Sequence, residues 1–135
     1  MKILLYCKNS EENEKAVQIA LEQAKAFDVS VLLVSCIQGK QGVPTEITEK
    51  TAAKIEAKMQ DYIDNTFAPA GISCSSEVIV TSGPLGEKVV SLAKDNKVDT
   101  IVMSIQKRSK IGKMVFGSNS QFVILEAPCK VITIN

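Results

Sequence analysis

The chain has 135 residues, 45% of them hydrophobic and 23% charged, and its formal net charge at pH 7 is +1. This composition excludes a disordered chain, and the near-neutral charge excludes a general nucleic-acid binder, which would be far more basic. The length predicts one domain, residues 1–135, with a sizeable core.

The sequence carries no signal for a membrane or for export. No run reaches the roughly 18 apolar residues of a membrane span. Residues 1–10 lack the long apolar region and the cleavage site of a signal peptide. We therefore expect a cytoplasmic protein without a membrane partner.

Few residue types remain for catalysis or metal binding. Histidine is absent, which removes Ser-His and Cys-His catalysis and histidine-ligated metal sites. No two cysteines form a C-x-x-C pair, because they are spread along the chain: Cys7, Cys36, Cys74 and Cys129. We expect small buried thiols, as is usual in the cytosol. The alternative is a metal or redox pair of Cys7 and Cys36, which both lie late in predicted strands.

Short apolar runs alternate with longer amphipathic stretches along the chain. A buried strand is expected at residues 3–7, followed by a helix at 11–28 whose apolar face ends at Phe27. The pattern then predicts a strand at 31–36, a helix at 45–66, a strand at 75–81, a helix with Pro84 in its first turn, a strand at 98–103, a helix at 118–125 and a strand at 131–134.

This alternation predicts a doubly wound, Rossmann-like α/β fold. The five strands form one parallel sheet, and right-handed crossovers place helices on both of its faces. Two common strand orders, 3-2-1-4-5 and 2-1-3-4-5, remain open on the residues alone. They place the ligand cleft beside residues 104–117 or beside residues 81–83, respectively.

The segment between the fourth strand and the last helix is the most informative one. It holds four cations, Lys107, Arg108, Lys110 and Lys113, and it leads into a helix that begins Gly117, Ser118, Asn119, Ser120. Residues 118–121 match a capping box, with Ser118 as the cap. Since a helix N-terminus attracts anions, the segment predicts an anion site. The alternative is an exposed basic loop followed by an ordinary helix cap.

Several stretches of the chain resemble the universal stress protein family, in the family's order. Residues 3–16 resemble its opening strand and helix, residues 82–84 the entry to its third helix, and residues 107–118 and 127–131 its C-terminal signature. The resemblance implies the strand order 3-2-1-4-5 and a non-enzymatic stress-response protein that works by ligand binding and dimerisation. It also implies a homodimer formed through the last strand, at Val131, Ile132, Thr133 and Ile134.

The ATP-binding members of the family carry G-x-x-G, nine residues, then G-[ST]. Gly117 and Ser118 match the last pair, whereas Ser104 and Lys107 stand at the first two glycines. The family's Asp-Gly-Ser after the first strand reads Lys8, Asn9, Ser10 here. Because a side chain at these glycines crowds a phosphate, we expect weak or absent ATP binding and a smaller anion or AMP-like ligand.

The predicted ligand site lies between the loops after the first and fourth strands. Its residues are Lys8, Asn9, Ser10, Ser104, Lys107, Arg108, Gly117, Ser118, Asn119 and Ser120. One alternative is an ATP-binding universal stress protein with nucleotide-dependent switching or weak ATPase activity. A third hypothesis is an interaction protein without a ligand.

Overall fold

The computed structural model describes residues 1–7, 13–39, 42, 44–105 and 117–134. The predicted alternation of strands and helices is confirmed. In chain order the elements are β1 (Lys2–Tyr6), α1 (Glu14–Phe27), β2 (Ser30–Gln38), α2 (Thr45–Thr66), β3 (Cys74–Thr81), α3 (Leu85–Asp95), β4 (Thr100–Ser104), α4 (Ser118–Glu126) and β5 (Lys130–Ile134).

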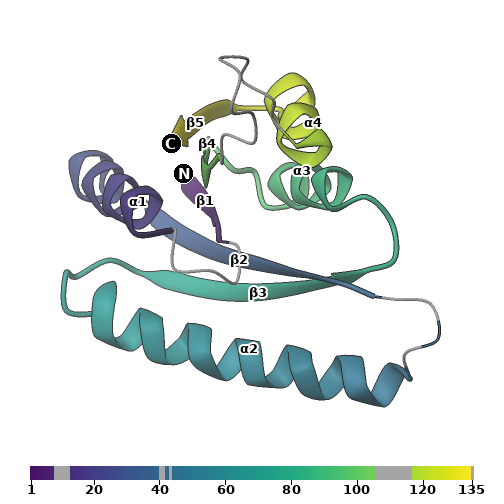
Figure 1. Cartoon of the computed structure of the whole chain (residues 1–135). Coiled ribbons are helices and arrows are strands. Elements are labelled where there is room, and N and C mark those ends of the chain that lie inside the picture. The colour runs from purple at the N-terminus through teal and green to yellow at the C-terminus, as the bar shows by residue number, and fades with distance from the viewer. Residues whose placement is uncertain (8–12, 40–41, 43, 106–116, 135) are drawn as a thin grey trace, which may run out of the picture.

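The strands form one parallel sheet in the order β3-β2-β1-β4-β5, with β1 at its centre (Figure 1). This confirms the order implied by the family resemblance and excludes 2-1-3-4-5. Tyr6, the last residue of β1, is paired with Val34 of β2 and with Met103 of β4. The strand order reverses between β1 and β4, so ligands are expected at the carboxyl ends of these strands.

Successive side chains of the central strand point to opposite faces of the sheet, and each face carries its own core. Ile3 and Leu5 of β1 pack with residues of α1 and α2, whereas Leu4 packs with residues of α3 and α4. We call the α1/α2 side the packed face and the α3/α4 side the cavity face. Helices therefore cover both faces, as predicted.

The packed face is closed by the C-terminal end of α2 and the residues after it. Met59 and Ile63 are buried there, and Phe67 is 0% exposed. The Phe67 ring meets the ring of Tyr62 edge to face, with 6.4 Å between centroids. Phe27, the last residue of the predicted apolar face of α1, is not buried with the rest of that face. Its side chain is 62% exposed, and the Lys130 ammonium lies 6.0 Å from its ring centroid, in a cation–π contact.

On the cavity face, α3 and α4 lie side by side and touch near their N-terminal ends (Figure 1). The contact depends on Gly86 in the first turn of α3. A Cβ atom at this position would lie 2.8 Å from the backbone oxygen of Asn119. The absence of a side chain at Gly86 thus allows α4 to approach α3 closely.

Candidate functional site

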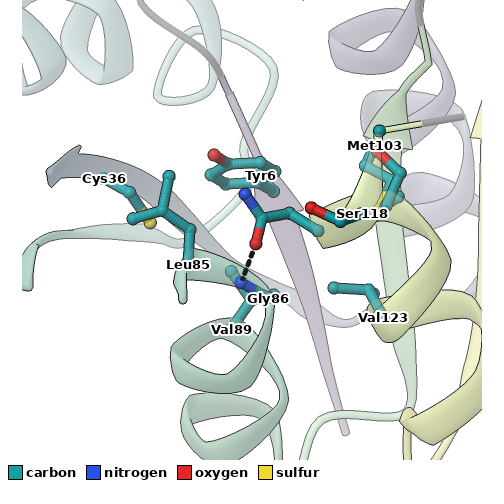
Figure 2. Close-up of a pocket in the computed structure, with 11 residues that line it drawn as sticks. Tyr6, Cys36, Leu85, Gly86, Val89, Met103, Ser118 and Val123 are labelled. Carbon is teal, nitrogen blue, oxygen red and sulfur yellow. Dashed lines mark hydrogen bonds between the residues drawn. The ribbon is translucent and has the colours of Figure 1, made fainter. Parts of the chain in front are cut away.

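A cavity of about 380 Å³ opens on the cavity face at the carboxyl ends of β1, β2 and β4. Its walls come from three strands and from the N-terminal ends of α3 and α4, as Figure 2 shows for the labelled residues. The lining residues are Tyr6, Cys36, Leu85, Gly86, Val89, Met103, Gly117, Ser118, Asn119, Ser120 and Val123. This is the position at which open α/β sheets bind ligands.

The cavity has an apolar wall and a polar wall. Strand and helix side chains such as Met103, Val89 and Val123 form the apolar wall, and residues 117–120 form the polar one. The first helical bond of α4 runs from the Gln121 N–H to the Gly117 carbonyl, over 3.1 Å. The N–H groups of residues 118–120 precede that bond and have no carbonyl within the helix to bind. The polar wall is therefore suited to an anion.

The capping box predicted at residues 118–121 is wrong. Gly117 occupies the N-cap position in an extended conformation, with φ −63° and ψ 152°, and no side chain caps the helix. Ser118 is already the first helical residue, so its hydroxyl lies beyond the position from which a cap is made. Pro84 likewise precedes α3 as its N-cap instead of lying in the first turn.

Asn119 joins the two helices at the cavity. Its Oδ1 atom accepts a hydrogen bond of 3.0 Å from the Gly86 N–H, which Figure 2 marks with a dashed line. Gly86 lies in the first turn of α3, where backbone N–H groups have no partner within their own helix. A side chain of α4 thus stabilises the N-terminus of α3. This fixes the spacing between the two helix ends that line the cavity.

The structure brings together part of the predicted site. Gly117, Ser118, Asn119 and Ser120 line the cavity together. Ser104 ends β4, half-buried, and is not among the residues that line the cavity in the described part of the chain. The remaining predicted residues lie outside the described ranges: Lys8, Asn9, Ser10, Lys107 and Arg108.

Sequence reasoning missed the apolar wall, including Tyr6, Cys36, Leu85, Val89 and Met103. A usable signal was present, because Tyr6 and Met103 lie at the ends of the two strands that flank the switch point. Ligand sites in such sheets form beyond strand ends. Gly86 carried no comparable signal, since its contact with Asn119 spans 33 positions of the chain.

Tyr6 and Cys36 are neighbours in the apolar wall, and their side chains come from the adjacent strands β1 and β2. Burial and the neighbouring Cys36 raise the pKa of Tyr6 well above its usual value of 10. Burial also raises the pKa of Cys36 to about 11, although the nearby Tyr6 hydroxyl acts in the opposite direction. Both groups are therefore neutral near pH 7.

The alternative pair of Cys7 and Cys36 is wrong, because the two thiols lie on opposite faces of the sheet. Cys7 packs on the core of the packed face and Cys36 on that of the cavity face. All four cysteines are free and half-buried, which agrees with the thiol interpretation. Burial raises the pKa of Cys7 and of Cys74 to about 12. Within the described ranges, no group of three His, Cys, Asp or Glu residues is arranged to hold a metal ion.

A model of the universal stress protein family matches residues 1–135. A curated relative, the universal stress protein encoded in the 3′ region of a QAH/OAS sulfhydrylase gene of Thermus aquaticus, is 26% identical over 133 residues. The match covers 98% of this chain and 96% of the relative. As for membrane spans, none of the described helices combines the length and the apolarity that a bilayer crossing needs.

Solved structures of universal stress proteins share the fold. One from Archaeoglobus fulgidus is 26% identical, with a TM-score of 0.75 over 100% of this chain and 98% of its own. Another, from the same organism in complex with dAMP, is 22% identical, with a TM-score of 0.70 and coverage of 100% and 98%. A universal stress protein in complex with cAMP is 17% identical, with a TM-score of 0.75 and coverage of 100% and 97%. Because the family model matches residues 1–135, this chain belongs to the universal stress protein family.

Proposed function

We propose that residues 1–135 act as a single, non-enzymatic stress-response domain that binds an adenine nucleotide with a short phosphate group. The observation that carries this proposal is the cavity of about 380 Å³, in which an apolar wall adjoins the N-terminus of α4. This volume is at the small end of the roughly 300–1,000 Å³ of typical ligand sites. The base packs against Met103 and Val89, and the phosphate accepts hydrogen bonds from the N–H groups of residues 118–120.

Two further observations support this ligand class and a cytoplasmic location. The dAMP and cAMP held by the similar proteins are both adenine nucleotides with one phosphate. The cysteines of this chain are free thiols, which suits a reducing compartment. Ser104 and Lys107 stand at the first two glycines of the ATP motif, so a triphosphate is the poorer ligand.

Isothermal titration calorimetry on the whole chain with AMP, cAMP, ATP and inorganic phosphate tests the ligand class. We expect AMP to bind more tightly than ATP, because the site lacks the glycines along the triphosphate path. The combined substitution Lys8→Asp, Ser104→Gly and Lys107→Gly is expected to improve ATP binding. Tighter binding of ATP than of AMP by the native chain would contradict the proposed ligand class, and binding of neither nucleotide would contradict the site.

A pair of single-charge variants tests where the phosphate lies. Ser120→Asp places a carboxylate on the polar wall, in the first turn of α4, where the helix dipole favours a negative charge. The variant should therefore fold, while charge repulsion lowers AMP affinity about tenfold or more. Gln121→Asp adds the same charge one residue later, outside the cavity lining, and should cost much less affinity. Equal losses in the two variants would place the phosphate elsewhere.

We further propose that the protein forms a homodimer through β5, with Val131, Ile132, Thr133 and Ile134 at the interface. The strand lies at the edge of the sheet, paired with β4 alone among the described strands, and an unpaired apolar edge favours pairing with another chain. The Ile134 carbonyl accepts a hydrogen bond of 2.8 Å from the Ile105 N–H. The backbone groups of Ile134 therefore face the β4 side. Because strand residues alternate, the N–H of Thr133 faces away from β4.

This alternation provides a matched test of the dimer. Thr133→Pro removes the outward N–H without removing a donor to β4, and proline is tolerated at sheet edges. Thr133→Val keeps the N–H and serves as the control. We expect sedimentation velocity to give a dimer for the native chain and for Thr133→Val, and a monomer for Thr133→Pro. A monomeric native chain at micromolar concentration would contradict the proposal.

A further inference from the structure

We propose that Tyr6 is the specificity-determining residue of the cavity, with its ring forming the wall on which a flat heteroaromatic ligand stacks. The inference rests on the proposed nucleotide site and adds the residue that selects aromatic ligands over other small phosphates.

The backbone that carries Tyr6 is fixed on both sides. Tyr6 ends the central strand, and it is paired with Val34 of β2 and with Met103 of β4. Its side chain points to the same face as Leu4, toward the cavity, because alternate residues of a strand share a face. Figure 2 shows the ring between Cys36 and Ser118, which places it beside both the apolar and the polar wall.

The side chain of Tyr6 lies beside the end of β2, where Cys36 is its neighbour in the cavity wall (Figure 2). What this side chain offers a flat ligand is its ring surface, which stacks on aromatic groups.

The cavity has its volume of about 380 Å³ with this ring in place, so a ligand fits beside the ring without displacing it. Tyr6 is therefore a wall of the site and does not block it. A sugar phosphate without a base uses the N–H groups at α4 but gains nothing from the ring. The structure thus predicts that AMP depends on Tyr6 and that ribose 5-phosphate does not.

The tyrosine content of the chain allows a direct optical test. There are two tyrosines and no tryptophan, and the second tyrosine, Tyr62, lies on α2 at the packed face. In a Tyr62→Phe variant, Tyr6 is the only tyrosine emitter. We expect AMP to change its emission and ribose 5-phosphate to leave the emission unchanged. An unchanged emission at saturating AMP would overturn the proposal.

Calorimetry on matched variants gives a second test. Tyr6→Val is expected to weaken AMP binding roughly two- to tenfold, the contribution of one aromatic pair, while binding of ribose 5-phosphate stays the same. Tyr62→Phe, at the packed face, is the control and should leave the affinity for AMP unchanged.

The two proposals fail in different ways. If the native chain binds no nucleotide in the calorimeter, the proposed function is wrong and the inference falls with it. If the native chain binds AMP and Tyr6→Val binds it equally or more tightly, the inference alone is wrong. Should Tyr6→Val not fold, the emission of the Tyr62→Phe variant still decides the question.

Discussion

The two faces of the sheet both carry an apolar core, and the cavity of about 380 Å³ opens on the α3/α4 side. The packed face is covered by α1 and α2, and α2, a helix of 22 residues, runs along β3 (Figure 1). Phe67, which follows α2, is fully buried there. The cavity face is covered by α3 and α4, of 11 and 9 residues. These short helices pack on each other at Gly86 and present their N-terminal ends to the carboxyl edge of the sheet. Space for a ligand therefore depends on helix length and helix contact more than on residue type.

The largest effect is expected on the packed face. Phe67→Ala removes a fully buried ring and should lower the free energy of unfolding by about 3–5 kcal/mol. Urea denaturation monitored by circular dichroism measures it. Phe27→Ala is the matched control, because Phe27 is 62% exposed, and its effect should stay within about 0.5 kcal/mol. Similar losses in the two variants would mean that the packed face is not closed by Phe67.

The next effect concerns the helix contact on the cavity face. Gly86→Ala places a Cβ atom 2.8 Å from the backbone oxygen of Asn119, which cannot turn away as a flexible side chain would. We expect a loss of about 1–3 kcal/mol in the free energy of unfolding and weaker AMP binding, because the N-terminus of α4 shifts. Gly117→Ala meets no atom within 4 Å and should change stability little. Equal stabilities of the two variants would contradict the close approach.

The free energy of unfolding should depend on pH through the two buried thiols of the packed face. Their pKa values rise from 9.0 to about 12 on folding, because Cys7 and Cys74 are buried. Below pH 9 both states keep the thiol protons. Between 9 and about 12 the unfolded chain loses them first, so stability falls as the pH rises through this window. Urea midpoints measured under reducing conditions at about pH 8 and about pH 10 test this.

Two cysteine variants separate the thiol contribution from other alkaline effects. Cys74→Ala removes one of the buried groups and should make the fall in stability between these pH values shallower. Cys129 is less buried than Cys74, and desolvation raises its pKa by less. Cys129→Ala should therefore change the slope of stability against pH less than Cys74→Ala does. A slope that is the same in the native chain and in Cys74→Ala would contradict the assignment.

The smallest effect on stability is expected at the polar wall of the cavity. No side chain caps α4, so Ser118→Ala should change the free energy of unfolding by less than about 0.5 kcal/mol. Its affinity for AMP should still fall, because the hydroxyl lines the cavity. A loss of stability of about 1 kcal/mol or more, as at a serine N-cap, would show that Ser118 caps the helix after all.

Much of the fold could be predicted from local patterns. The second helix has the predicted bounds, Thr45–Thr66, because Pro44 and Pro69 flank a single amphipathic stretch. The strand order could not be chosen on the residues alone, since both orders bury the same apolar strands. The N-cap of α4 was assigned to Ser118 instead of Gly117, because the run Ser118, Asn119, Ser120 offers several polar residues that can cap a helix.

The candidate site was predictable only where it is continuous in sequence. Residues 117–120 form one stretch, and they were found. The apolar wall draws Tyr6, Cys36, Val89 and Met103 from four separate elements, so no local spacing connects them. Each of them also fits an ordinary strand or helix core. Their shared role is visible only once the sheet order brings the ends of β1, β2 and β4 together.

The pairing of β1 with β4 also determines the order in which the chain can fold during synthesis. The Lys2 N–H donates a hydrogen bond of 2.8 Å to the Asp99 carboxylate, across 97 positions of the chain. One edge of the central strand therefore stays unpaired until residues 100–104 have left the ribosome. Long-range parallel pairing is slow, and an open apolar edge promotes aggregation. The nascent chain is most exposed to misassembly in that interval, when β1, β2 and β3 exist and the strand that completes the sheet's centre does not.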